Sequence, residues 1–327
     1  MKKILSRLFE MDTLTEQDAF ELMQRIGAGE YNEAQLASLL TVWMVRPVTI
    51  EELSGFSTAL IRLAIPFQPD VPVIDVCGTG GDGKNTFNIS TLTSFVLAGA
   101  GYMVAKHGNY GVSSVSGSST VMEHYGYRFT NDASILASQL EKANICFMHA
   151  PLFHPALKHV GNVRRQLGMK TVFNMLGPLV NPARPAYRLT GVFNLEMGRM
   201  YHYLLQDSET QYAIVHSLDG YDEISLTGRV KFFTKKEEKV YTPEELGFKT
   251  LREQDIFGGE TAAEAAQIFM SILEGKGTPE QNNAVLANAA AAIRVIESNL
   301  SHEEANSKAM ESLLSLKALH SFKQVLE

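Results

Sequence analysis

The stretch Val73-Ile-Asp-Val-Cys-Gly-Thr-Gly-Gly-Asp-Gly83, followed by Thr86 and by Asn88-Ile-Ser-Thr91, decides the fold of this chain. The apolar residues 73–77 predict a short buried strand, and four glycines within residues 78–83 predict a tight turn after it. A helix is expected from Ser90 to about Ala100. Glycines let a backbone approach an anion closely, and the first unpaired amides of a helix point at it. Strand, turn and helix together predict an anion-binding cradle.

The glycine turn differs from the common nucleotide-binding loops. No Gly-Lys-Ser/Thr follows four variable residues, as a Walker loop requires, and the acidic Asp82 inside the turn does not suit a Rossmann fingerprint. An acid beside a phosphate cradle favours a sugar hydroxyl or a metal-bound water as its partner. The alternative is a tight turn in which Asn88 or Ser90 only caps the helix.

The pattern of expected helices and strands changes near residue 70. Residues 1–70 are typical of helix, and three prolines in residues 66–72 mark a junction. Further strands are expected at 103–105, 145–148, 189–193 and 212–215, with helices at 132–143, 155–168 and 195–206. We expect a small all-helical domain over residues 1–70, joined by a segment near 165–185. Residues 71–327 form an expected large α/β domain with a mostly parallel central sheet flanked by helices.

A second polar stretch runs from Lys106 to Ser119 and has almost no apolar content to fold around. Such a segment is ordered when something polar binds it, which indicates a ligand loop. Lys106 supplies a point charge for a phosphate, Asn109 can donate and accept, and Ser113, Ser114 and Ser118 are small donors. A surface loop without a ligand is the alternative.

Two further groups carry possible chemistry. Asp222 and Glu223 are adjacent carboxylates, which suit Mg²⁺, although a solvated acidic pair is the alternative for these two residues alone. Arg164 and Arg165 stand side by side on one expected helix, so they face different directions and only one readily serves a given site. A guanidinium binds a carboxylate through two parallel hydrogen bonds.

Composition narrows the class of protein. The chain has 29 basic and 36 acidic residues, a net charge of −7, which disfavours a nucleic-acid or anionic-membrane surface. Polar residues interrupt every apolar stretch well before the ~20 residues that cross a bilayer. Cys77 and Cys146, far apart in apolar runs, are expected to be buried thiols in a reducing compartment. We therefore expect a cytoplasmic protein that binds neither membrane nor nucleic acid.

Taken in order, several blocks resemble the anthranilate phosphoribosyltransferase family: Gly-Thr-Gly-Gly-Asp, Asn-Ile-Ser-Thr, Lys-His-Gly-Asn, His-Pro-Ala, Val-Arg-Arg, Asn-Met-Leu-Gly-Pro-Leu and Asp-Glu-Ile-Ser. The resemblance runs from about residue 10 to about residue 295. It implies a fold similar to nucleoside phosphorylases and phosphoribosyltransferases, with the site between the two domains and a homodimer. It also implies Mg²⁺, and transfer of a phosphoribosyl group from 5-phosphoribosyl 1-pyrophosphate (PRPP) to anthranilate in tryptophan biosynthesis.

The resemblance also implies roles for particular residues. The magnesium contacts fall on Ser90, Asp222 and Glu223, and the anthranilate contacts on Gly78, Asn109 and Arg164. Lys106, His107, Asp222 and Glu223 are the expected catalytic residues, with Lys106 assisting the departing pyrophosphate and His107 taking a proton. The expected PRPP contacts are Gly78, Gly81, Asp82, Thr86, Asn88, Ile89, Ser90, Thr91, Lys106, His107, Gly108, Asn109, Tyr110, Gly111, Val112, Ser113, Ser114 and Ser118.

The chain departs from the family pattern in its lysine loop. Tyr110 and Gly111 stand where the family usually has Arg-Ser, and Val115 stands where lysine is common. Two positive charges are therefore absent, so donor binding is expected to be weaker there or compensated elsewhere. Two alternative functions stay open from the sequence: a pyrimidine-nucleoside phosphorylase, and a non-catalytic nucleic-acid-binding relative.

Overall fold

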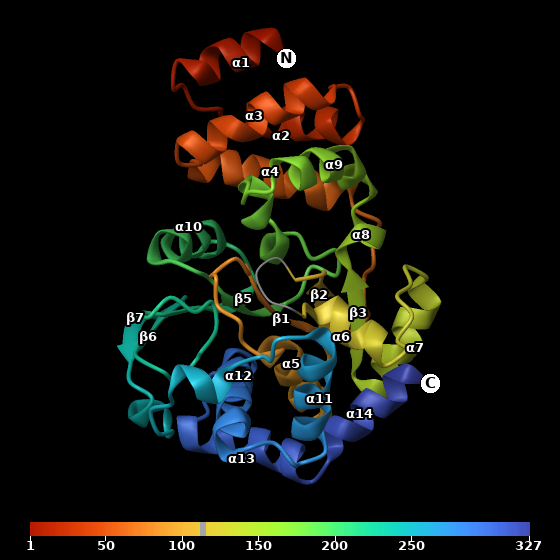
Figure 1. Ribbon diagram of the computed structural model, residues 1–327, viewed down its shortest axis with the longest axis vertical. Helices are drawn as coiled ribbons and strands as arrows, with labels where there is room; N and C mark the ends of the chain where they lie inside the picture. The colour runs from red at the N-terminus through yellow and green to blue at the C-terminus, as the bar shows by residue number, and fades with distance from the viewer. Residues whose placement is uncertain (112–115) are drawn as a thin grey trace. The chain divides into compact units, whose positions relative to one another are not determined.

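The computed structural model describes residues 1–111 and 116–327, which fold into two compact units. Residues 1–67 and 150–184 form the helical unit, and residues 68–149 and 185–327 form the α/β unit (Figure 1). The chain leaves the α/β unit after residue 149, contributes residues 150–184 to the helical unit, and returns at residue 185. The helical unit therefore consists of two segments that are distant in sequence.

The first segment of the helical unit contains four helices: α1 (Lys2–Phe9), α2 (Glu16–Gly27), α3 (Glu33–Val45) and α4 (Ile50–Leu63). The second contains α8 (Ala150–Phe153), a 3-10 turn (Pro155–Leu157), α9 (Lys158–Leu167) and the 3-10 turns Val172–Asn174 and Gly177–Leu179. The helix expected over residues 155–168 is thus a 3-10 turn followed by a shorter α-helix. His154 precedes a proline, which disfavours α-helical backbone there, and its φ of −117° and ψ of 67° agree with that.

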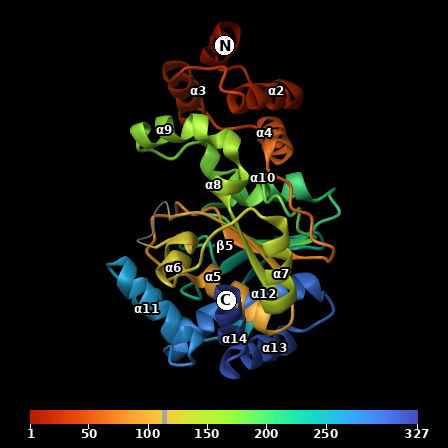
Figure 2. The same cartoon turned by 90° about the vertical axis from the view of Figure 1, so that its right-hand side faces the viewer.

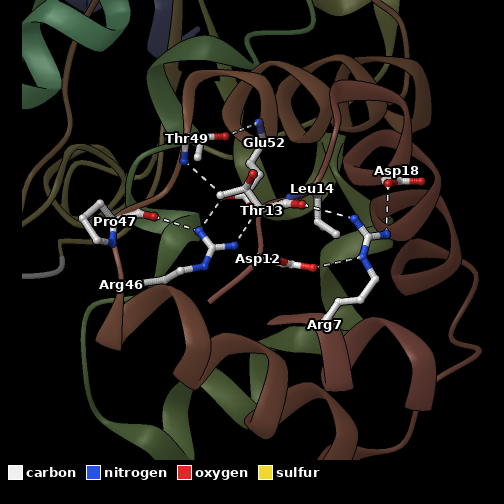
Figure 3. A network of polar contacts seen from close by, with 9 residues as sticks. All are labelled: Arg7, Asp12, Thr13, Leu14, Asp18, Arg46, Pro47, Thr49 and Glu52. Carbon is white, nitrogen blue, oxygen red and sulfur yellow. Dashed lines mark hydrogen bonds and ion pairs between the residues drawn. The ribbon is translucent and has the colours of Figure 1, made fainter. Parts of the chain in front are cut away.

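Glu52 at the start of α4 connects α4 to the ends of the loops that precede α2 and α4 (Figure 3). Its buried carboxylate accepts hydrogen bonds from both terminal nitrogens of Arg46, at 2.5 and 2.9 Å, and from the backbone amides of Leu14 and Thr49. The Thr49 side chain accepts in return from the Glu52 amide, completing a capping box. Burial would raise the pKa of Glu52, but the hydrogen bonds, led by that from Arg46, lower it below its ordinary 4.5.

The central sheet of the α/β unit has seven strands in the order β3-β2-β1-β4-β5-β6-β7. Five run parallel: β1 (Ile74–Gly78), β2 (Val104–Gly108), β3 (Ile145–His149), β4 (Tyr187–Gly191) and β5 (Gln211–Ser217). The antiparallel strands β6 (Val230–Thr234) and β7 (Glu238–Tyr241) complete one edge. The mostly parallel sheet expected from the sequence is confirmed.

Helices cover both faces of this sheet (Figures 1 and 2). Phe232 and Phe233 are neighbours on β6 and point to opposite faces. Phe232 belongs to the core with α5 (Ile89–Gly99) and α12 (Pro279–Ile296), while Phe233 meets Gly198 of α10 (Leu195–Leu205). The remaining elements are α6 (Ser118–His124), α7 (Ala133–Ala143), α11 (Ala262–Leu273), α13 (His302–Leu314), α14 (Lys317–Leu326) and the 3-10 turns Glu244–Leu246 and Glu253–Ile256.

Among the helices of the described chain, none is both long and apolar enough to cross a membrane.

Replacing Glu52 with alanine is expected to lower the free energy of unfolding by about 3–5 kcal/mol, because Arg46 would stay buried without its charge partner. Glu51→Ala, at the exposed neighbouring position, is the matched control and should cost less than about 0.5 kcal/mol. Urea unfolding followed by circular dichroism measures both. A similar small change in the two variants would contradict a structural role for the Arg46–Glu52 pair.

Candidate active site

The candidate residues of the α/β unit gather where its parallel strands end. The strand order reverses direction at β1, since β2 and β3 lie on one side of it and β4 and β5 on the other. Ligands of parallel α/β sheets bind outside the carboxyl ends of the strands at such a switch point. The glycine turn follows β1, the lysine loop follows β2, and the Asp222–Glu223 loop follows β5. The topology therefore brings together three motifs that are distant in sequence.

Asp222 lies over the ends of β1 and β4. A Cβ on Gly78 would come within 2.3 Å of the Asp222 carboxylate, and a Cβ on Gly191 within 1.5 Å of the Asp222 carbonyl oxygen. The backbone amide of Gly80 donates to the Asp222 carboxylate at 2.6 Å. Two glycines at neighbouring strand ends thus leave the room that Asp222 occupies, and the glycine turn is bonded to it directly.

Three acidic side chains concentrate negative charge at this position. Burial, followed by the charge of Asp82, raises the pKa of Asp222 to about 7, against a lowering by the Gly80 amide. Burial, followed by the charges of Asp222 and Asp82, raises the pKa of Glu223 well above its ordinary value. One Glu223 carboxylate oxygen, Oε2, is buried without a hydrogen-bond partner in the described chain. Asp222 is therefore part of a buried acidic cluster, not a solvated pair.

This acidic cluster fits a hydrated divalent cation. Within residues 1–111 and 116–327, no three His, Cys, Asp or Glu side chains form a complete metal cage. Mg²⁺ does not need one, because it binds through one or two carboxylates and keeps waters and phosphate oxygens as its other ligands. Neutralising Asp222 and Glu223 with a cation would also remove the mutual repulsion that raises their pKa values.

Lys106 lies beside the start of α5 and is almost completely buried, with 1% of its surface exposed. Its Nζ donates to the Val76 carbonyl at 2.7 Å and to Ser90 Oγ at 3.4 Å. Burial lowers the pKa of Lys106, whereas the charges of Asp75 and Glu223 oppose that shift. Lys106 and Ser90 belong to different sequence motifs, but they are direct neighbours in the structure.

Asn88 connects the glycine turn to the lysine loop. It makes no side-chain cap on α5, so the interpretation of Asn88 as a mere helix cap is wrong. Its Nδ2 instead donates to the Ser116 carbonyl at 2.8 Å. Asn88 Oδ1, Thr91 Oγ1 and Thr79 Oγ1 are buried and have no hydrogen-bond partners in the part of the chain that is described. Asn88 and Thr91 lie at the start of α5 and Thr79 follows β1, and these unpartnered polar atoms are suited to a polar ligand.

The described parts of the lysine loop fold back on each other. Gly117 packs so closely that a Cβ there would lie 2.0 Å from the Gly111 amide nitrogen. Ser118 Oγ donates to the Asn109 carbonyl at 3.1 Å. The exposed Tyr110 donates from its hydroxyl to Glu123 at 2.9 Å, and its ring meets the His149 ring edge to face. The expected PRPP contacts at Val112, Ser113 and Ser114 lie outside the described residues.

Several other expected contacts are glycines, lie in the core, or bond to the rest of the fold through their backbone. Ile89 is fully buried in the hydrophobic core, so only its backbone can meet a ligand. Gly108 packs against Ser118, whose Oγ would lie 2.5 Å from a Cβ there. The backbone amide of His107 donates to Asp75, and Gly81 takes a left-handed φ of 75°. Thr86 forms an antiparallel bridge with Phe257.

Arg164 belongs to the helical unit, on α9. Its guanidinium lies 5.3 Å from the centre of the Phe173 ring, and burial lowers the pKa of Arg164. The neighbouring Arg165 is exposed, so the two arginines do face different directions, as expected. No carboxylate of the described chain forms an ion pair with Arg164, which leaves its guanidinium available to a carboxylate ligand.

The sequence did not single out Gly191, Thr79 or the buried charge of Asp75. Asp75 interrupts an apolar strand, and that charge inside β1 was the available signal; in the structure it pairs in register with Arg188 of β4. Gly191 ends β4 just as Gly78 ends β1, but only the folded sheet shows that Asp222 covers both. The strand expected at 189–193 accordingly ends at Gly191, where the Asp222 backbone packs on it.

Comparison with known families identifies the class of protein to which this chain belongs. Residues 70–319 match the glycosyl transferase family α/β domain, and residues 2–64 match the helical bundle domain of the same family. The chain belongs to the glycosyl transferase family. Anthranilate phosphoribosyltransferase of Flavobacterium psychrophilum is 55% identical over 326 residues, covering 99% of this chain and 98% of that protein. The enzyme of Bacteroides fragilis strain YCH46 is 52% identical over 328 residues, covering 100% and 99%. Within that class, the chain is a member of the anthranilate phosphoribosyltransferases.

Solved structures agree with this assignment. Anthranilate phosphoribosyltransferase from Thermus thermophilus superposes with a TM-score of 0.91 at 32% identity, covering 98% of both chains. The enzyme from Saccharomyces cerevisiae, solved in complex with PRPP and Mg, superposes with a TM-score of 0.90 at 26% identity, covering 98% of this chain and 95% of that one. The expected fold class is therefore confirmed.

The raised pKa of Asp222 predicts that its ionised carboxylate lowers the free energy of unfolding at neutral pH. The folded state holds the Asp222 proton more tightly than the unfolded chain, so the free energy of unfolding falls as pH rises from about 3.8 to about 7. Asp222→Asn is expected to raise the unfolding temperature at pH 8, with a much smaller gain at pH 4. Calorimetry across this range tests it, with Asp219→Asn as an exposed control in the same loop. A gain independent of pH would contradict the shifted pKa.

Proposed function

We propose that this chain transfers the phosphoribosyl group of PRPP to anthranilate, releasing pyrophosphate in tryptophan biosynthesis. The observation that carries the proposal is the meeting of the acidic cluster, the Lys106–Ser90 pair and the start of α5 at the strand ends. Family membership supports the same activity over its alternatives, since the similar proteins are named anthranilate phosphoribosyltransferases.

The donor would be held mainly by the two glycine- and serine-rich motifs. The amides at the start of α5, with Ser90 and Thr91, suit the anionic groups of PRPP. Asp82 and the described residues of the lysine loop, from Lys106 to Gly111 and Ser118, complete the proposed donor site. Lys106 is held beside Ser90 by its bond to the Val76 carbonyl, so its charge is placed before any ligand arrives. A pre-placed charge stabilises a departing anion without reorganisation.

Magnesium would be held by Ser90, Asp222 and Glu223, together with water and the donor's phosphate oxygens. When bound, it supplies charge neutralisation for the departing pyrophosphate. The yeast relative was solved with PRPP and Mg, which supports this assignment. Support from this chain comes from the raised pKa values of Asp222 and Glu223, and from the unpartnered buried Glu223 Oε2.

The acceptor requires little activation. The aromatic amine of anthranilate is neutral at physiological pH, so positioning and charge stabilisation can supply most of the acceleration. Arg164 would bind the carboxylate of anthranilate, with Gly78 and Asn109 as further contacts. His107 follows Lys106 at the end of β2, and we assign it the late acceptance of the amine proton. The yeast relative was also solved with 4-fluoroanthranilate, in agreement with a site for this class of acceptor.

The activity is tested by the loss of anthranilate fluorescence with PRPP and Mg²⁺ both present. The expected result is a loss that needs both, with no loss when either is omitted. Release of thymine from thymidine with phosphate and without magnesium would instead identify the nucleoside phosphorylase. Salt-sensitive binding of single-stranded DNA without fluorescence loss would identify the nucleic-acid-binding relative.

Arg164→Ala is expected to raise the KM for anthranilate by the equivalent of roughly 1.5–3 kcal/mol, the contribution of a hydrogen bond to a charged group. The KM for PRPP should change little. Arg165→Ala is the matched control, since its exposed side chain faces another direction. Steady-state kinetics with each substrate varied in turn measures both variants. An unchanged anthranilate KM in Arg164→Ala would remove Arg164 from the acceptor site.

We also propose a cytoplasmic homodimer. Phe9, Met11 and Val45 are large apolar side chains of the helical unit that remain 58–72% exposed, which favours burial against a second copy. Light scattering should give twice the 36.1 kDa mass of the chain; the mass of one chain would contradict the dimer.

Cys77 and Cys146 are free thiols, as in a reducing compartment, although Cys77 is partly exposed and not buried as expected.

A further inference from the structure

A segment outside every motif described so far, residues 253–259, lies along residues 84–87, which continue the glycine turn toward α5. It begins with the 3-10 turn Glu253–Ile256 and leads into α11. We call residues 253–259 the backing segment. Its residues are more than 160 positions from the glycine turn in sequence, so their proximity is a product of the fold alone.

The backing segment binds the glycine turn through its backbone. The Phe87 amide donates to the Ile256 carbonyl at 3.3 Å, and the Gly258 amide donates to the Asn85 carbonyl at 2.8 Å. Thr86 and Phe257 form an antiparallel bridge between these two bonds. The segment therefore pairs with residues 85–87 as a short strand would.

One side chain reinforces this pairing. Asn85 Nδ2 donates to the Gly259 carbonyl at 2.7 Å, so Asn85 contacts the backing segment through both its backbone and its amide. The approach is close enough to require glycine, since a Cβ on Gly258 would lie 2.5 Å from the Thr86 carbonyl oxygen. The Asn85 bond is the side-chain contact that fixes the turn against the segment.

Lys84 makes a second connection. Its Nζ lies 2.9 Å from the Glu253 carboxylate and 4.5 Å from the centre of the Tyr221 ring. Its backbone amide donates to Asp82 at 2.9 Å. Tyr221 directly precedes Asp222, so Lys84 joins the glycine turn, the backing segment and the acidic loop.

The glycine turn needs external support of this kind. Gly80, Gly81 and Gly83 all have positive φ, and a Cβ on Gly80 or Gly83 would meet no atom within 4 Å. Glycine loses more conformational entropy on ordering than any other residue. A turn with little packing of its own is therefore ordered by the groups that bond to its ends.

We propose that the backing segment holds the glycine turn in the conformation that binds the donor sugar, with Asn85 and Lys84 as positioning residues. The inference rests on the proposed function, because the donor is PRPP. Neither residue contacts the donor in this account. Each lowers the entropy that the turn loses when the donor binds, so each acts on donor affinity and not on the acceptor.

The test is the Kd of PRPP with Mg²⁺, measured by calorimetry on the full chain. Asn85→Ala is expected to raise that Kd roughly five- to tenfold, the equivalent of one amide hydrogen bond. Asn306→Ala is the matched control: Asn306 Nδ2 donates to the Leu246 carbonyl at 2.9 Å, is also part-buried, and joins segments 60 residues apart. The control should leave the Kd within about twofold of wild type.

Lys84→Met provides a second variant that keeps the Asn85 bond. It should also raise the PRPP Kd and KM, with kcat at saturating PRPP and the anthranilate KM close to wild type. Unchanged PRPP affinity in both folded variants, or equal weakening in Asn306→Ala, would overturn the positioning role. Absence of PRPP binding by the wild-type chain would instead overturn the proposed function, so the two failures are distinguishable.

Discussion

The arrangement of the site depends on one constraint, the burial of the Asp222 carboxylate over the ends of β1 and β4. That position exists only because Gly78 and Gly191 have no side chains, and it is fixed by the hydrogen bond from the Gly80 amide. A carboxylate placed there approaches Asp82 and Glu223, so the site carries an electrostatic cost in the absence of a cation. The glycines, the acidic cluster and the proposed magnesium site are therefore one feature of the structure.

Buried charge of the opposite sign balances part of this cost. Lys106 lies beneath the start of α5, within bonding distance of Ser90, and its charge lowers the pKa of Glu223. Asp75 in turn acts on Lys106 and on Arg188, whose pKa burial lowers. These charges are buried in the sheet and not carried on mobile surface side chains. Such groups can stabilise charge that develops during a reaction without first rearranging.

Sequence patterns predicted much of this architecture because they depend on local physics. Apolar runs and glycine spacing indicated five of the strands and the helix start at α5. The position of Asp222 over the strand ends could not be predicted, since it depends on two strands, 113 residues apart in sequence, that lie side by side. The partner of Asn88 in the folded chain could not be predicted for a similar reason. Its cap-like position is a local signal, but its partner, Ser116, is reached only through the fold. The pairing of residues 253–259 with residues 85–87 has no signal in the local sequence of either segment.

Proton release on donor binding tests the central role of the acidic cluster most directly. At pH 7 the buried Asp222 carboxyl is partly protonated, and binding of magnesium with PRPP should drive its proton off. Calorimetry of that binding in buffers of different ionisation enthalpy gives the number of protons released. The wild-type chain should show a net release that is clearly smaller in Asp222→Asn, because the amide has no proton to lose. Equal release by the two proteins, or net proton uptake by the wild type, would contradict the central role of the acidic cluster.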